Sequence, residues 1–77
     1  MKSKEHILLQ ERIRLGKLLA KIRKEKGLST YQLAELTGIR QPHISWLENG
    51  RSNASTDTIN KVASALGVRI ELNYLTE

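Results

Sequence analysis

Cysteine is absent from this 77-residue chain, and its two histidines, His6 and His43, lie far apart in the sequence. Disulfides and a zinc site are therefore excluded as supports for the fold, and we expect no metal and no other cofactor. No apolar run approaches the ~20 residues that a membrane-spanning helix needs. The chain also does not open on the apolar stretch of a signal peptide. We therefore expect a cytoplasmic protein that does not engage a membrane.

The chain is short and basic. Its length predicts a single domain over residues 1–77, and a chain of this size buries only about 60–65% of its unfolded surface. Association into oligomers is the remaining way to supplement so small a core. Thirteen Lys and Arg residues against eight acidic ones give a net charge of +5 and a pI near 9.9. This balance favours a polyanion as partner, although charge alone is weak evidence.

Helical periodicity predicts one long helix over residues 1–26, ended by Gly27, with residues 1–12 as an extension of a core over 13–67. Gly16 weakens this helix by about 1 kcal/mol unless a neighbouring helix packs close to it. We interpret its apolar face as core rather than as a membrane-binding surface, because it lacks Trp and Phe. A further helix is predicted between Ser55 and Gly67. The residues predicted to form the buried faces of these two helices are Leu8, Leu15, Leu19, Ile22, Ile59, Val62, Ala63 and Leu66, with Ile7, Ile13 and Leu18 at the margins of the first.

The stretch from Leu28 to Gly50 reads as two short amphipathic helices around a tight break at Thr37-Gly38-Ile39. Ser29 occupies the expected N-cap position of the first helix, and Gly38 suits the left-handed backbone at its end. Leu33, Ala34 and Leu36 occupy one side of the first helix, as Ile44 and Leu47 do in the second. The other faces of the second helix are polar, which suits a helix that lies in a DNA groove.

This stretch, LSTYQLAELTG followed by a short polar helix and ISWLENG, resembles the helix-turn-helix of the phage-repressor/Cro-like (XRE) family. Members of that family have LSQ-x-x-LA-x-x-x-G, then a short polar helix, then I-x-x-W/L-E-N-G. The resemblance covers residues 15–68. It implies an all-α, lambda-repressor-like domain of four helices, in which the second helix of the motif reads DNA. Residues 1–12 and the tail after Val68 lie outside the resemblance.

The second helix of the motif carries the predicted base-reading residues. The resemblance implies that Gln41 reads a base, since an amide there pairs with adenine or bridges to guanine. Arg40 stands where the family has a capping Ser or Thr, so we expect it to contact a base or a phosphate, with a solvated arginine as the alternative. Pro42 suits a thymine methyl, and His43 a base or phosphate. Trp46 shares their face, and three roles remain open: packing on deoxyribose, on a protein partner, or on the first helix of the motif.

Predicted phosphate contacts flank that helix. Ser29 and Thr30 place hydroxyls at a helix N-terminus, which attracts anions. For Ser29, capping alone is the alternative. Ser45, Asn49 and Arg51 are the other predicted phosphate contacts, the last two because the chain leaves the helix there.

The ENG segment predicts a structural ion pair. The resemblance implies that Glu48 pairs with Arg23, and the residues agree, because Glu48 follows core residue Leu47 and needs a cation if it is buried. Elsewhere, the chain holds no Ser or Cys nucleophile beside a base, no Gly-rich phosphate loop and no metal-ligand spacing. We therefore expect a protein that is not an enzyme.

The tail over residues 68–75 alternates apolar and polar residues until Leu75, which is the period of a half-buried strand. We expect this C-terminal β-strand to pair with its copy in a second chain, which would give a homodimer. The alternative is a tail that folds over its own domain. The predicted dimerisation residues are Val68, Ile70, Leu72 and Tyr74.

Together these features predict a sequence-specific transcriptional regulator of double-stranded DNA, a repressor that binds an inverted repeat as a homodimer. A second interpretation is the antitoxin of a toxin–antitoxin pair, because the short domain resembles Hip- and Hig-type antitoxins; it requires a protein toxin as partner. Trp46, Tyr31, Tyr74 or the N-terminal extension would then contact the toxin. A third interpretation is a protein-interaction module that does not bind DNA.

Overall fold

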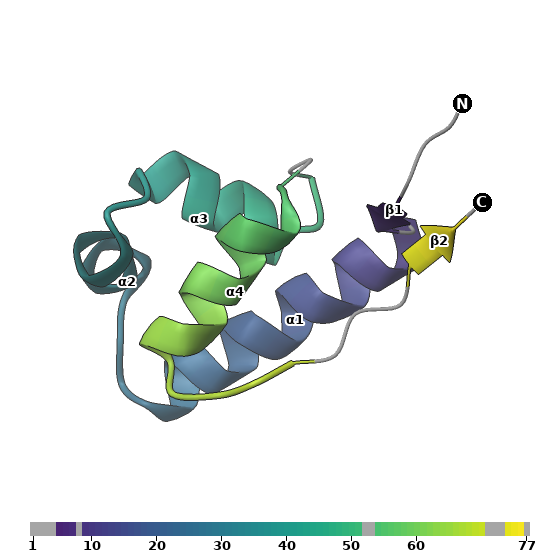
Figure 1. The fold of residues 1–77 in the computed structure, drawn as a ribbon. Helices are drawn as coiled ribbons and strands as arrows, with labels where there is room; N and C mark the ends of the chain where they lie inside the picture. The colour runs from purple at the N-terminus through teal and green to yellow at the C-terminus, as the bar shows by residue number, and fades with distance from the viewer. Residues whose placement is uncertain (1–4, 8, 52–53, 71–73, 77) are drawn as a thin grey trace.

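The computed structural model describes residues 5–7, 9–51, 54–70 and 74–76, which form a helical domain with a short terminal sheet (Figure 1). Helix α1 is the longest, α2 and α3 pack against each other, and α4 lies in front, between α3 and α1. In chain order the elements are β1 (Glu5–Ile7), α1 (Leu9–Glu25), α2 (Thr30–Thr37), α3 (Gln41–Glu48), α4 (Thr56–Ala65) and β2 (Tyr74–Thr76).

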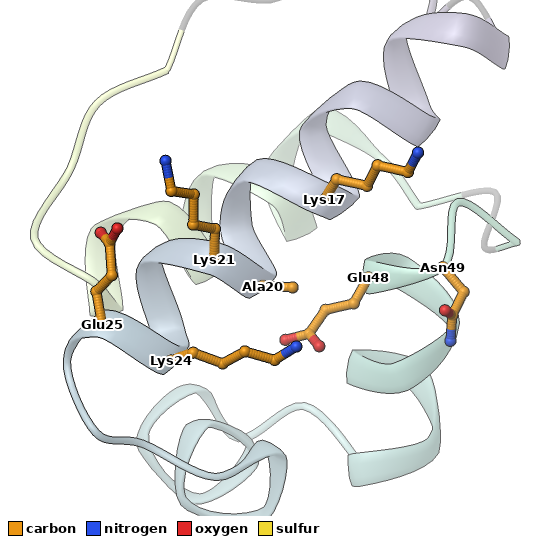
Figure 2. A pocket seen from close by; sticks show the side chains of 7 residues that line it. All are labelled: Lys17, Ala20, Lys21, Lys24, Glu25, Glu48 and Asn49. Carbon is orange, nitrogen blue, oxygen red and sulfur yellow. The ribbon is translucent and has the colours of Figure 1, made fainter.

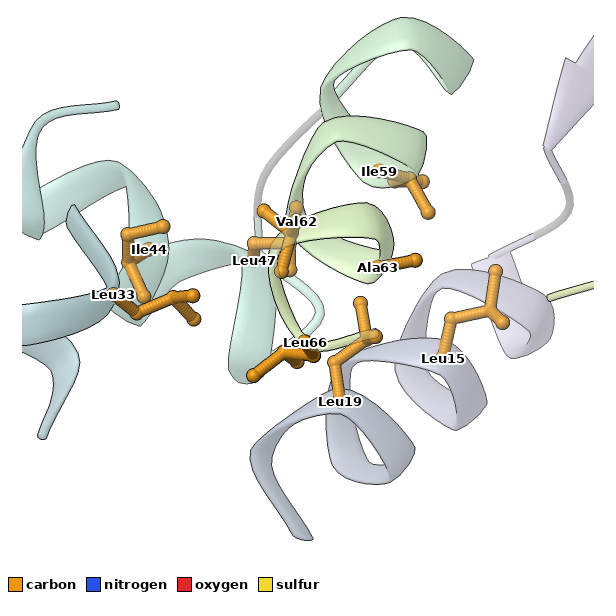
Figure 3. Close-up of a cluster of buried hydrophobic side chains, with 9 residues drawn as sticks. All are labelled: Leu15, Leu19, Leu33, Ile44, Leu47, Ile59, Val62, Ala63 and Leu66. Carbon is orange, nitrogen blue, oxygen red and sulfur yellow. The ribbon is translucent and has the colours of Figure 1, made fainter. Parts of the chain in front are cut away.

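All four helices contribute to one apolar core (Figure 3). The pattern of the sequence predicted these positions, and each of them is less than a tenth exposed. Burying side chains of this kind is worth roughly 1.5–3 kcal/mol each, which is what holds the two short helices in place. The core residues are Leu15, Leu19, Leu33, Ile44, Leu47, Ile59, Val62, Ala63 and Leu66.

Helix α1 touches the backbone of α3 at Gly16. A Cβ atom at this position would collide with the carbonyl oxygen of Leu47 and would lie 2.8 Å from that of Glu48. The missing side chain therefore lets the two helices approach closely. This close packing is the condition under which we expected a glycine to be tolerated inside the long helix.

Local signals set the ends of the middle helices as predicted. The Ser29 hydroxyl accepts a hydrogen bond from the Gln32 amide at 3.0 Å, and the Gln32 side chain accepts one from the Ser29 amide at 2.7 Å. This reciprocal pair is a capping box. Gly38 ends α2 with a φ of 75°, a backbone conformation that costs glycine little. At α4, the Ser55 hydroxyl accepts from the Thr58 amide at 3.2 Å.

The N-terminal prediction was partly wrong. Residues 9–12 are helical, but Glu5–Ile7 form strand β1 instead of continuing the helix; residues 1–4 and 8 lie outside the described residues. Strand β1 pairs antiparallel with β2, with His6 opposite Leu75. A strand ladder satisfies backbone groups as completely as a helix does, so the distant C-terminal segment overrides the local helical period.

The tail prediction was also wrong in extent and in partner. Residues 68–70 are not a strand, and residues 71–73, which include the predicted dimerisation residue Leu72, lie outside the described residues. The strand at Tyr74–Thr76 pairs within its own chain. The Val68 amide instead donates to the Ala63 carbonyl at 3.0 Å, and Val68 and Ile70 pack against the core. The alternative, a tail that folds over its own domain, is confirmed. A partner in the same chain avoids the entropy cost of association.

Leu36 departs from the expected pattern of α2. It was placed on the side of Leu33, but it is 61% exposed, and Thr37 is buried in its place. Residues four apart lie on one helix face, whereas Leu36 is turned about 60° from Leu33. The Thr37 hydroxyl can be buried because it donates to the Leu33 carbonyl at 2.9 Å. None of the helices in the described part of the chain is long and apolar enough to cross a membrane.

Candidate nucleic-acid interface

Helix α3 presents a polar outer face opposite its two core residues. Ile44 and Leu47 are buried, while Arg40, Pro42 and His43 are exposed. Arg40 stands at the N-cap and its side chain makes no capping hydrogen bond, so its guanidinium is not committed to the helix end. Pro42 lies in the first turn, where its missing N–H removes no intrahelical bond. The predicted base-reading residues therefore lie together on or beside the exposed side of α3.

Trp46 extends this face toward the C-terminal end of α3. It is 45% exposed, and its ring meets that of His43 edge to face, with 5.1 Å between centroids and an interplanar angle of 81°. This arrangement is favoured for aromatic pairs because a ring edge is positive and a ring face negative. The contact orients the indole and leaves almost half of its surface open to another molecule.

Gln41, at the first position of α3, is half-buried and held by two neighbours. Its amide nitrogen donates to the hydroxyl of Ser45 at 2.9 Å and to that of Thr30, on α2, at 3.1 Å. An amide carries two N–H donors, so both are used inside the protein. The sequence predicted the position of Gln41 but not this network, which couples α2 to α3 and orients the amide oxygen.

The predicted phosphate-contacting residues lie at both ends of the α2–α3 pair. Ser29 is exposed and caps α2, so the capping role is present. Asn49 and Arg51 are exposed just after α3, where the Asn49 side-chain amide donates to the Ser45 carbonyl at 2.8 Å. Thr30 and Ser45 are half-buried and engaged with Gln41. Their hydroxyls therefore have a positioning role as well.

Arg23 of α1 and Glu48 of α3 form the predicted ion pair. Two parallel bonds join them, from Arg23 Nε to Glu48 Oε2 at 2.6 Å and from Nη2 to Oε1 at 3.0 Å, and both side chains are 10% exposed. Arg23 Nη1 also donates to the Leu28 carbonyl at 2.7 Å. The hydrogen bond that Arg23 donates to Glu48 raises the pKa of Arg23 above its ordinary value. The pair thus fastens α1, the start of α2 and the end of α3 together.

Sequence reasoning missed a groove between α1 and the end of α3 (Figure 2). In the structure, Lys17 and Lys24 flank Ala20 on the side of α1 that approaches Glu48 and Asn49. The sequence contained a signal for this arrangement: Ala20 follows Lys17 by three residues and precedes Lys24 by four, and residues at these spacings share one face of a helix.

Comparison with known proteins places this geometry in a family. The helix-turn-helix family model HTH_3 matches residues 19–73. An immunity repressor protein of Bacillus phage phi105 is 36% identical over 56 residues, which are 73% of this chain and 39% of that protein. The chain thus spans about two-fifths of the length of this relative.

Two solved structures share the fold. The restriction-modification controller protein C.AhdI from Aeromonas hydrophila superposes with a TM-score of 0.73 at 33% identity, covering 78% of this chain and 91% of that one. A toxin–antitoxin module from Streptococcus pneumoniae gives a TM-score of 0.65 at 33% identity, covering 86% of this chain and 73% of that one. HTH_3 is a family of DNA-binding regulators and not an enzyme family. The chain belongs to this helix-turn-helix family, of the Cro/C1 or XRE type, and is a DNA-binding transcriptional regulator.

Proposed function

We propose that this protein is a repressor that binds an inverted-repeat operator as a homodimer. The observation that carries the proposal is the outer face of α3, which presents Arg40, Pro42, His43 and Trp46 to solvent beside a pre-positioned Gln41. Such a helix fits the major groove, where the pattern of donors and acceptors distinguishes all four base pairs. We propose a binding function without catalysis, in the compartment that holds the DNA, the cytoplasm.

In this proposal Gln41 reads a base and its neighbours position it. Its amide nitrogen is held by Thr30 and Ser45, and its amide oxygen would accept from a donor such as N6 of adenine. Release of one internal bond would free an N–H for a bidentate contact. Arg40 contacts a guanine edge or a phosphate, Pro42 a thymine methyl and His43 a phosphate or a base.

Phosphate contacts would set the orientation of α3 in the groove. We assign them to Ser29 at the N-terminus of α2, Thr30 and Ser45 beside Gln41, and Asn49 and Arg51 after α3. Contacts of this kind fix the register of the protein on the duplex without reading its sequence. Trp46, at the edge of the same face, packs on deoxyribose.

Two-fold pairing follows from the shortness of α3. Its eight residues reach only a few base pairs, so one copy reads too short a site for high specificity. Two copies about a two-fold axis would place their α3 helices about 34 Å apart, in successive major grooves. Selection of bound fragments from random DNA tests this, because a dimer enriches inverted half-sites one helical turn apart. Enrichment of isolated half-sites would contradict it.

Gln41→Ala tests the base-reading role. On the selected operator we expect a loss of about 1–3 kcal/mol in binding free energy, with little change on unrelated DNA. Gln10→Ala is a matched control, because Gln10 is an exposed glutamine at the far end of α1. Equal losses on both DNAs would refute base reading. Ser45→Ala removes one acceptor from the Gln41 amide and one proposed phosphate contact, so it should cause a smaller loss of operator preference than Gln41→Ala and a slight loss on unrelated DNA.

An antitoxin is the second candidate function. It is favoured by the structural similarity to the Streptococcus pneumoniae toxin–antitoxin module and by two apolar side chains on α2, Tyr31 and Leu36, which are 70% and 61% exposed. A toxin that covers them would become a partner in addition to DNA. Co-expression with the product of an abutting reading frame should then yield a stable complex that Tyr31→Ala weakens.

A further inference from the structure

The groove between α1 and the end of α3 is large for so small a domain, at about 590 Å³. Its walls are the exposed flank of α1 and the last turn of α3 (Figure 2). Lys24 reaches toward the Glu48 carboxylate, and Lys17 lies farther along α1, toward its N-terminus. Asn49, which we assigned to a phosphate, stands at the α3 wall. The groove is thus continuous with the proposed DNA-binding face.

The lining of this groove is positively charged. Three lysines, Lys17, Lys21 and Lys24, face two carboxylates, and that of Glu48 is already neutralised by its paired bonds with Arg23. Only Glu25 opposes the lysines, so the lining keeps a net charge of +2. A cluster of exposed ammonium groups beside a recognition helix attracts the most abundant anion there, the phosphodiester backbone.

The spacing of the two outer lysines fits a nucleic-acid strand. Lys17 and Lys24 are seven residues apart, which is about 10 Å along a helix that rises 1.5 Å per residue. A DNA strand carries one phosphate per roughly 3.4 Å of helix axis, so two lysines this far apart would contact two different phosphates. Lysine acts at such sites as a point charge without demanding a fixed geometry.

We infer that this groove binds the DNA backbone beyond the base-reading face, with Lys17 and Lys24 as phosphate contacts. The inference rests on the proposed function and extends it: α1, which lies outside the helix-turn-helix, becomes part of the DNA interface. Because phosphates are the same in every sequence, these lysines add affinity on any duplex and no discrimination between operators.

The salt dependence of binding measures these contacts directly. The slope of log K against log salt falls by about 0.9 for each phosphate contact removed from double-stranded DNA. The double variant Lys17→Gln with Lys24→Gln should therefore lower the slope by about 1.8 on the operator and equally on unrelated DNA. The matched control is Lys61→Gln with Arg69→Gln, which removes the same net charge from exposed positions on α4 and after it. We expect the control to keep the wild-type slope.

The outcomes separate this inference from the proposed function. Equal slope changes in the two double variants would show a general charge effect and would overturn the inference. A wild-type slope in the Lys17/Lys24 variant would also overturn it and would favour an acidic protein segment as the occupant of the groove. In both cases, loss of operator preference in Gln41→Ala would leave the proposed function standing. Failure of the wild-type protein to bind any DNA would overturn both. Thermal unfolding monitored by circular dichroism checks that the variants remain folded.

Discussion

Breaking the ion pair between Arg23 and Glu48 should destabilise the domain more than any surface change. Both side chains are 10% exposed and joined by two parallel bonds, and Arg23 makes a third bond to the Leu28 carbonyl. Removing one partner leaves a charge that is withdrawn from water and no longer compensated. Such losses cost about 3–5 kcal/mol, and we expect about 3 for Glu48→Ala because each side chain keeps some contact with water.

That loss is large beside the stability available. At roughly 0.05–0.15 kcal/mol per residue, a chain of this length has about 4–12 kcal/mol in total. Arg23→Met should cost more than Glu48→Ala, because it also leaves the Leu28 carbonyl without its donor, at about 1–3 kcal/mol. Urea unfolding followed by circular dichroism would measure both. The melting temperature should fall by at least about 12 °C in each.

The double variant Arg23→Met with Glu48→Ala is the decisive measurement, because it combines the two single changes. Replacing both members of a buried pair by apolar residues is often nearly neutral, so the double variant should be more stable than either single one. The matched control is Lys61→Gln, which removes an exposed charge from α4 and should change stability far less. Additive losses in the double variant would show that the two side chains are not coupled and would refute the reasoning.

The pH dependence of the stability that Arg23 contributes follows from the direction of its pKa shift. The hydrogen bond that Arg23 donates to Glu48 raises the pKa of Arg23 above its ordinary value, so the arginine contributes its stability fully below the unfolded-state pKa and loses it only as the pH rises through the higher, folded-state pKa. The destabilisation measured for Arg23→Met should therefore be constant between about pH 6 and pH 9. A steady decline across this interval would contradict the assignment.

Three further predictions concern single residues. Gly16→Ala should destabilise by about 1–3 kcal/mol although alanine favours helices, because its Cβ meets the backbone of α3; denaturant unfolding showing a gain would contradict the close approach. Ser29→Ala should cost about 1 kcal/mol in the same assay through loss of the capping box, and Ser29→Asp, which restores a capping oxygen, should recover much of it. Trp46→Ala should weaken operator binding in a fluorescence titration while the melting temperature stays near that of the wild type, since Trp46 is 45% exposed. Unchanged affinity would exclude Trp46 from the interface.

Much of the fold could be predicted from the sequence, because helix caps and apolar periodicity are local signals. Ser29, Gly38 and Ser55 mark helix ends by satisfying backbone groups within a few residues, and the spacing of the apolar residues defines the buried faces. The exposed face of α3 follows directly, because what is not buried on an eight-residue helix points outward. The pairing of Glu48 needed the family resemblance in addition, since its partner lies 25 residues away.

Only the tertiary structure determines which segments far apart in the chain contact each other. The terminal strands pair with each other, although residues 5–7 belong to a stretch that the local pattern predicts as helix. Gln41 is held by Thr30 across the turn, and the α1 lysines meet the end of α3 in a shared groove. By itself, the sequence determined which residues form helices and which of their faces are buried, since periodicity and capping act over one or two turns. Distant partners depend on packing geometry, which no single segment encodes.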